Sequence, residues 1–460
     1  MRPALFALLL TAGPLFAQEA TLKADATKAL KSAATYYREK VASHGGYVYF
    51  YSLDLADRWG EGKASADILF VQPPGTPTVG MAYLAAHAAT GDQFYLDAAR
   101  ETAECLVYGQ LQSGGWTQVI HYTKANRVGK YRNGKGGNWN VSSLDDDQTQ
   151  AALKFLMRAD AALGFKNKEI HEAAEYGLNA LLKAQFANGG FPQVWQGPVP
   201  EQPVKKASFP KGDWKTEGKL KNHYDHYTLN DGLAGTVAEV LIVAHEVYKD
   251  DKYKKALAKL GDFLILAQLP DPQPGWCQQY NFDMVPIWAR KFEPPAITGW
   301  ESQDAMETLI KIARYTGEKK YLEPIPPALK YFVRHVSKEK TVPRFIEFGT
   351  DKPLYMDAAY QLTYDPANAP THYGWTQPAR FDRIEKAYES AKKGEAEAKP
   401  KPPTADEVRK VIAAVDKDGR WVSEYAGERL VGQPKFDKGF KYLSSGVFSK
   451  NVETLAGYIR

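Results

Sequence analysis

Two short acidic stretches have the residue types of a metal site. One is Asp145-Asp146-Asp147 in "SSLDDDQTQAAL", and the other is Asn230-Asp231 in "YTLNDGLAGTVAEV". Carboxylate and amide oxygens are the hard ligands that calcium prefers. Asp and Asn are also favoured helix N-caps. Capping therefore stays an alternative, although a single cap does not explain three acids in a row.

A third stretch, "WARKFEPPAITGWES", is basic. Arg290 and Lys291 stand beside Glu293 just ahead of a predicted helix, where cations are unfavourable. They could face an anion beside a metal, but a salt bridge between Arg290 and Glu293 on the rim would explain the same residues. Arg344, in "VPRFIEF", could hold a carboxylate through two parallel hydrogen bonds.

These stretches fit into a repeat. The Gly-aromatic turns "GGWTQ", "GGFPQ" and "PGWCQQ" follow one another at intervals of about 70 to 85 residues. Between them, Ala, Leu and Tyr recur at helical spacing, which predicts two helices per unit. Stacked helical hairpins form an open solenoid or a closed toroid. The small residues of the inner helices favour an all-α fold, an α/α toroid of repeated helical hairpins with few short strands.

A toroid would bring the chemistry together. Equivalent helix starts lie at one mouth of such a ring, so we expect six polar residues to converge there: Asp145, Asp146, Asp147, Asn230, Asp231 and Arg290. The aromatic residues of the turns are expected to anchor packing, with stacking on sugars as the alternative. His223 and His226 are expected on a polar rim loop, with metal binding as the alternative. The three turn aromatics are Trp116, Phe191 and Trp276.

The two ends of the chain have a different character. Residues 1–17 carry one early charge, an apolar run and a small-residue cleavage site near Ala17, which predicts a signal peptide and a secreted or periplasmic protein. No later apolar run approaches the ~18 residues of a membrane span. We expect the toroid in residues 18–384, a charged, Pro-rich linker in 385–408 and a C-terminal extension in 409–460.

The composition of the chain limits the classes of partner that the protein is expected to bind. The formal net charge is +5, which suits a polyanionic ligand but falls far short of the basic excess of a nucleic-acid binder. Export would permit a disulfide between the only two cysteines, Cys105 and Cys277, although their spacing does not establish one. We expect a monomer.

Taken together, the motifs resemble the family 10 polysaccharide lyases, the pectic acid lyases. The resemblance rests on "GGWTQ", "GGFPQ", "SSLDDDQT", "YTLND", "WCQQYNFDMVPIWARKFEPPAITGWES" and "RFIEFGTDKPLY" and covers roughly residues 27–383. It implies a toroid that cleaves polygalacturonate, or a related uronate polysaccharide, by anti β-elimination with the help of calcium.

The resemblance also implies roles for single residues. The family's calcium ligands fall on Asp145 and Asp231, with Asp146 and Asn230 as assisting neighbours. Its catalytic arginine, which takes the C5 proton, falls on Arg290. Substrate binding falls on Arg344, with Lys291 and Lys352 as further cations.

The sequence departs from the family pattern at two positions. Gly232 stands where a second acid is usual, and Ala358 stands near the place of another substrate-binding arginine. A non-catalytic relative, or one of altered specificity, is therefore one alternative. An inverting glycoside hydrolase on the same toroid, which would need two carboxylates and no calcium, and a terpene cyclase-like toroid are the others.

Overall fold

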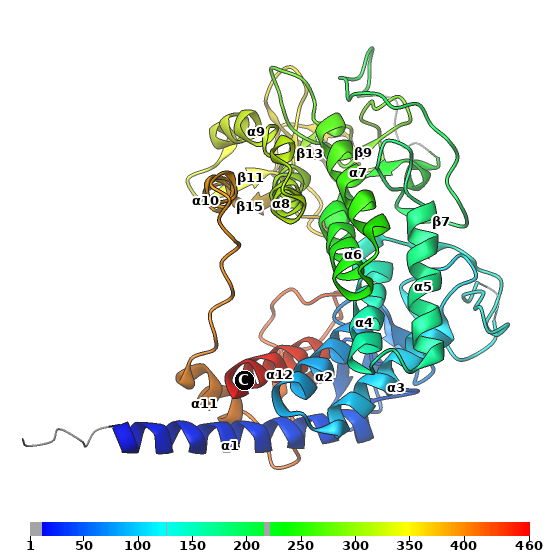
Figure 1. Ribbon diagram of the computed structural model, residues 1–460. Coiled ribbons are helices and arrows are strands. Elements are labelled where there is room, and N and C mark those ends of the chain that lie inside the picture. The colour runs from blue at the N-terminus through cyan, green and yellow to red at the C-terminus, as the bar shows by residue number, and fades with distance from the viewer. Residues whose placement is uncertain (1–11, 126, 216–220) are drawn as a thin grey trace, which may run out of the picture.

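The computed structural model describes residues 12–125, 127–215 and 221–460, and it is mainly helical (Figure 1). The described residues form twelve α-helices: α1 (Ala12–Tyr36), α2 (Thr76–Thr90), α3 (Gln93–Gly109), α4 (Gln148–Ala162), α5 (Lys168–Lys183), α6 (Leu233–Tyr248), α7 (Asp251–Ala267), α8 (Gly299–Thr316), α9 (Ile325–Phe332), α10 (Phe381–Lys392), α11 (Ala405–Ala413) and α12 (Ser445–Ile459).

The helices form two layers around a ring. α12, α2, α4, α6, α8 and α10 pack side by side in that order and form the inner layer, and α3, α5, α7 and α9 pack behind them. Figure 1 shows this arc, with the chain running in extended form from α10 to α11 across the side where these two helices stand apart. The predicted α/α toroid of helical hairpins is confirmed.

The outer helices begin with conventional caps. The side chains of Asp92, Asn167 and Asp250 accept hydrogen bonds from backbone N–H groups in the first turns of α3, α5 and α7. This satisfies donors that a helix N-terminus leaves without a partner. Each inner helix of these hairpins instead follows a short strand, so its start is positioned by strand pairing.

Four antiparallel strand pairs repeat around the ring. In each, the segment before an inner helix pairs with the segment that follows its outer helix. The pairs are β4 (Ile68–Phe70) with β5 (Val119–His121), β6 (Ser142–Ser143) with β7 (Val194–Trp195), β8 (Tyr227–Thr228) with β9 (Gln279–Tyr280), and β10 (Ile297–Thr298) with β12 (Phe345–Ile346).

Other strands complete the ends of the ring. β12 continues into β13 (Pro353–Met356) and β14 (Leu362–Thr363), and β11 (Thr341–Pro343) pairs with β15 (Thr376–Pro378). A five-stranded sheet has the order β16-β17-β1-β2-β3. Its strands are β1 (Phe50–Ser52), β2 (Arg58–Trp59), β3 (Lys63–Ala64), β16 (Val422–Glu424) and β17 (Lys441–Ser444).

The C-terminal extension packs with the N-terminal part of the chain. β17 pairs with β1, and α12 packs against α2 and α1. The division into a toroid and an extension at 409 stays a prediction, but the extension shares the core of the first hairpin. The predicted signal segment lies mostly outside the described residues, and residues 12–17 begin α1.

The turn aromatics pack as expected, because Trp116, Phe191 and Trp276 are all buried. Cys105 and Cys277 are free and buried. In the part of the chain that the structure describes, no helix is both long and apolar enough to span a bilayer.

Candidate functional site

The two acidic stretches fold into matching turns. Asp145–Asp147 form the 3-10 turn η2 ahead of α4, and Asn230–Gly232 form η4 ahead of α6. The last two residues of each turn have positive φ, 46° and 60° at Asp146 and Asp147 and 54° and 69° at Asp231 and Gly232. The turns therefore correspond residue by residue, with Asp146 equivalent to Asp231 and Asp147 equivalent to Gly232.

The structure brings three acids together across two repeats. One carboxylate oxygen each from Asp145, Asp146 and Asp231 lies within 4.8 Å of the others. None of the turn residues caps its helix through a side chain. The capping alternative thus does not explain these residues.

Without a cation, burial and mutual repulsion disfavour the ionised forms of these three carboxyl groups. Burial, then the neighbouring Asp145 and Asp146, raise the pKa of Asp231 well above its usual value. Burial, then the charge of Asp145, raise the pKa of Asp146 to about 6. Burial also raises the pKa of Asp145, against a hydrogen bond from Gln193. Hard oxygen donors at this spacing, penalised by their mutual repulsion, fit a divalent cation such as calcium.

Glutamine side chains from the Gly-aromatic turns form hydrogen bonds with the two acidic turns, directly or through Gln72. The sequence analysis did not identify these glutamines. Gln193 Nε2 donates to Asp145 Oδ1 over 2.7 Å. Gln278 Nε2 donates to Asn230 Oδ1 over 2.9 Å. Gln118 Nε2 donates to Gln72, whose own amide donates to Asp146 Oδ2 over 3.1 Å. The signal was present, since each glutamine ends one of the repeated turn motifs.

In the fourth copy of the repeat, Arg344 occupies the position that a glutamine has in the other three. The backbone carbonyls of Gln118, Gln193, Gln278 and Arg344 each accept a hydrogen bond from the segment that leads into an inner helix. Arg344 is only 8% exposed, and its Nε has no hydrogen-bond partner among the described residues. Its guanidinium stacks on Tyr373, 4.1 Å from the ring centre. Arg344 thus combines a buried charge with a free donor.

Glu301 lies in the field of Arg344. Burial raises the pKa of Glu301, and the charge of Arg344 opposes that rise. In the part of the chain that the structure describes, the Oε2 atom of Glu301 has no hydrogen-bond partner. The charge of Arg344 also lowers the pKa of Asp231, against a larger effect of burial.

Arg290 faces the acids but is paired with Glu293. Its Nε and Nη2 atoms donate to the two oxygens of Glu293 over 2.8 and 2.5 Å. The rim salt bridge considered from the sequence therefore forms. Arg290 also lies within electrostatic reach of Asp145, Asp146 and Asp231. Burial would lower the pKa of Arg290, but the bonds to Glu293 outweigh it, so the pKa is raised.

The remaining predicted residues take other positions. With its amide as oriented here, Asn230 donates to Asp231 Oδ2 over 2.5 Å, so it orients that acid. Lys291 is exposed, with Nζ 3.7 Å from the centre of the Tyr360 ring. Lys352 lies opposite Glu347 on the β12–β13 hairpin, ~10 Å along the strand from Arg344.

Tyr373 is a second residue that the sequence analysis missed. Its hydroxyl donates to Glu293 Oε1 over 3.0 Å and accepts from Gln278 Nε2 over 3.3 Å. It stands in "YGWTQ", a further copy of the turn motif, which could have identified it.

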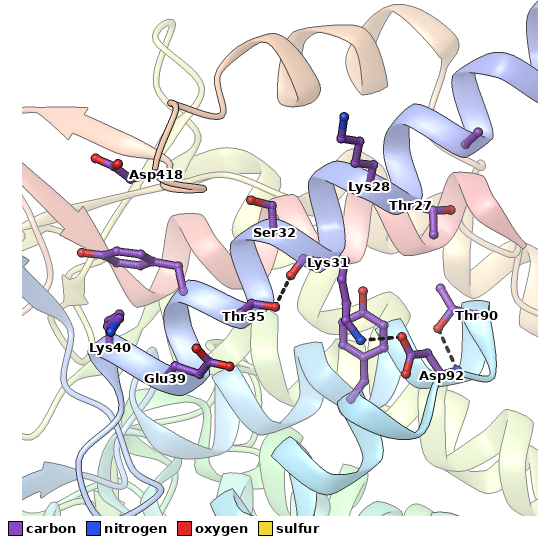
Figure 2. Close-up of a pocket in the computed structure, with 13 residues that line it drawn as sticks. Thr27, Lys28, Lys31, Ser32, Thr35, Glu39, Lys40, Thr90, Asp92 and Asp418 are labelled. Carbon is purple, nitrogen blue, oxygen red and sulfur yellow. Dashed lines mark hydrogen bonds and ion pairs between the residues drawn. The ribbon is translucent and has the colours of Figure 1, made fainter.

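A groove of about 940 Å³ lies along α1, and its lining does not include the acid cluster. Figure 2 shows that Lys31 and Asp92 in this groove face each other, and they form an ion pair at 2.6 Å. None of the residues predicted to carry chemistry lines it. Two of its charged groups are thus already paired, and the candidate site stays at the acid cluster.

One known protein family matches the part of the chain that carries this site. The family model described as pectic acid lyase matches residues 110–346, more than half of the chain and a span that holds the acid cluster, Arg290 and Arg344. No curated protein matches the chain.

Solved structures give more distant similarities. The family 10 polysaccharide lyase from Cellvibrio cellulosa is 19% identical, with 67% of this chain and 94% of that chain covered and a TM-score of 0.46. A variant of that lyase in complex with trigalaturonic acid is 20% identical, with 68% and 99% covered and a TM-score of 0.47. The cellobiose 2-epimerase from Spirochaeta thermophila DSM 6192 is 16% identical, with 98% and 99% covered and a TM-score of 0.48. On the family match, the chain belongs to the pectic acid lyase family.

Proposed function

We propose that this protein is an exported lyase that cleaves polygalacturonate, or a related uronate polymer, by calcium-assisted anti β-elimination. One observation carries the proposal: three acids from consecutive repeats converge within reach of Arg290 and Arg344. Family membership supports the substrate class, and the predicted signal peptide supports export.

The reaction requires removal of a proton α to a carboxylate. Asp145, Asp146 and Asp231 would hold calcium, which when bound neutralises the charge that builds on the substrate carboxylate. Gln193 and Asn230 fix two of these acids through hydrogen bonds of 2.7 and 2.5 Å. The acids are thus oriented before substrate arrives.

Arg344 would bind a substrate carboxylate. Its buried guanidinium has a free Nε donor and is fixed by its stacking on Tyr373. A charge-assisted hydrogen bond from a desolvated guanidinium is among the stronger polar contacts that a protein makes. We assign Arg344 to positioning the uronate whose C5 proton is removed.

Arg290 would accept the C5 proton, and the C4 oxygen would then leave. Arg290 can accept a proton only after losing its own, and its pairing with Glu293 opposes that loss. We therefore propose that the reaction is fastest at alkaline pH, where the neutral form of Arg290 is more populated.

The test is product formation from polygalacturonate at alkaline pH, with and without calcium. Ultraviolet absorbance follows the unsaturated product. The expected result is calcium-dependent product formation that Arg290→Ala abolishes and Arg158→Ala preserves. Arg158 is a suitable control because it pairs with Glu246 on an inner helix face.

Other results would exclude the proposal. New reducing ends without ultraviolet absorbance would show hydrolysis. Binding of the polymer without either product would show a non-catalytic relative.

A further inference from the structure

We propose that a pocket beside β7 is a subsite for an uncharged pyranose residue of the polysaccharide. The inference rests on the proposed function, because a polymer that enters the acid cluster would continue past this pocket. The pocket has a volume of about 770 Å³, and residues 194–200 and 224–226 line it together with Trp139, Pro192 and Phe282 among others. That volume lies within the range of small-molecule sites.

Aromatic rings line the pocket, and two of them are exposed. Trp139 is 47% exposed and Tyr224 is 38% exposed. Trp195 is held by a 3.0 Å hydrogen bond from its Nε1 to the carbonyl of Ser113. The C–H groups of a pyranose face can pack on such rings, which offer large apolar area at little loss of side-chain freedom.

The pocket is preformed. Pro192, Pro198 and Pro200 restrict its backbone. His226 stacks on Phe282 with ring centres 4.4 Å apart. A ligand therefore loses little binding free energy to ordering the protein.

The charge of the pocket selects an uncharged ligand. Among the described residues that line it, none is Lys or Arg, and the only carboxylate is Asp225. Burial raises the pKa of Asp225, against the charges of His226 and His223. An ionised uronate would find no Lys or Arg among the described lining residues to pair with its carboxylate and would lie near a second acid, which is unfavourable. A neutral sugar or a methyl-esterified uronate would not.

The pocket and the acid cluster share the segment that enters β7. Gln193 donates through Nε2 to Asp145, whereas its neighbours Pro192 and Val194 line the pocket. The backbone N–H of Gln193 donates to the carbonyl of Tyr224 over 2.9 Å. Adjacent residues at the start of β7 thus serve the two sites.

The experiment measures binding of three oligosaccharides of equal length to the full chain by calorimetry. They are a methyl-esterified oligogalacturonide, its de-esterified counterpart and a neutral galacto-oligosaccharide. We expect Trp139→Ala and Tyr224→Ala each to weaken binding of the esterified fragment roughly tenfold and that of the de-esterified one less than twofold. The control is Phe165→Ala, which removes another exposed aromatic that follows the C-terminal end of α4, a helix ~22 Å long, and does not line the pocket.

The outcomes separate the sources of the ligand. A response to both uncharged fragments assigns the pocket to any neutral pyranose, and a response to the esterified fragment alone assigns it to esterified uronate. The largest loss with the ionised fragment would place binding on the exposed Arg127 and Lys130 of the loop that carries Trp139, and would overturn the proposal. No loss in either variant would also overturn it. Failure of the lyase assay would remove the proposed function but leave this binding comparison intact.

Discussion

Tyr373 links groups that are distant in the sequence into one hydrogen-bonded chain. Arg290 donates to Glu293, Tyr373 donates to Glu293, and Gln278 donates to both Tyr373 and Asn230. Asn230 in turn donates to Asp231. The proposed proton acceptor and the proposed metal ligand are therefore positioned by one network, in which the loss of a member leaves its partners unsatisfied.

The first prediction concerns Glu293→Gln. Glu293 raises the pKa of Arg290, so removing its charge lowers that pKa and increases the neutral fraction of Arg290 at a given pH. We expect the rise of kcat/KM with pH to move down by roughly one pH unit. The control is Glu246→Gln, which lies outside the network. An unmoved profile would show that Arg290 is not the titrating group.

The second prediction compares Asp231→Asn with Asp147→Asn. Asp231 belongs to the acid cluster, whereas Asp147 lies 3.4 Å from Lys154 and outside it. Calorimetry should show calcium affinity falling roughly tenfold or more for Asp231→Asn and less than threefold for Asp147→Asn. In the wild type, affinity should fall as pH drops through about 6, because Asp146 then becomes protonated. Equal losses in both variants would argue against this ligand set.

At the scale of single residues, the sequence predicted which residue types form the candidate site better than it predicted the contacts between them. Asp145, Asp146 and Asp231 converge as expected, because the two turns that carry them hold equivalent places in the repeat. The same expectation was wrong for Asp147, which contacts Lys154 instead. The roles of Gln193 and Tyr373 depend on side-chain directions that no pattern along the chain specifies. The bidentate pairing of Arg290 with Glu293 was only one of two alternatives, since both readings place the same charges at the same helix start.

At the scale of elements, the matching turns η2 and η4 show whether glycine at position 232, where the family usually has an acid, removes a metal ligand. Gly232 matches Asp147, whose side chain points to Lys154 on an inner helix. A Cβ at Gly232 would lie 3.5 Å from Asp304 Oδ1. Position 232 thus faces the inside of the ring, and Gly232 leaves the three-acid cluster complete.

The third prediction follows for Gly232→Asp. The new carboxylate would lie against Asp304, so we expect lower stability at neutral pH and a change in calcium affinity of less than threefold. Gly232→Asn is the matched control, because it has the same shape without the charge and tolerates positive φ. Thermal unfolding and calorimetry measure the two effects. A clear gain in calcium affinity would contradict the assigned direction of this side chain.

Asp304 itself supplies the fourth prediction. Burial, then Glu307, raise its pKa to about 7, so ionisation is harder in the folded state than in the unfolded chain. The resulting loss of stability develops as pH rises from about 4 to about 7 and persists above. Asp304→Asn should therefore raise the free energy of unfolding by ~1–2 kcal/mol at pH 8 and by little near pH 4. Exposed Asp25→Asn should show no such pH dependence.

Helical periodicity predicted the hairpins, because burial of one face imposes it. It did not predict the positive φ of Asp146 and Asp231, since Asp adopts that conformation only when its surroundings require it.

For the whole molecule, the C-terminal extension completes the ring. Phe448 on α12 stacks on Tyr37 with ring centres 3.8 Å apart and contacts Tyr83. Arg429 donates to the carbonyl of His372, close in sequence to Tyr373. The extension thus joins the first hairpin to the last part of the ring. No local pattern predicted this, because the partners lie at opposite ends of the chain.

The fifth prediction tests that closure. Phe448→Ala removes a ring that is 1% exposed, and we expect a loss of ~3–5 kcal/mol in the free energy of unfolding. Val422→Ala, in the same extension but 37% exposed, should change it by less than ~0.5 kcal/mol. Denaturant unfolding measures both. A small effect of Phe448→Ala would mean that α12 unfolds separately from the ring.

The glutamine positions have a broader consequence. At Gln118, Gln193, Gln278 and Arg344 the backbone carbonyl binds the segment leading into an inner helix, whatever the side chain is. At these positions the backbone carbonyl thus stabilises the fold, and the side chain can serve the chemistry of the site. Each copy of the repeat can exchange its side chain without a change in architecture, as the arginine in the fourth copy already illustrates. The repeated hairpins thus provide a row of positions whose side chains can differ while the same backbone contact is kept.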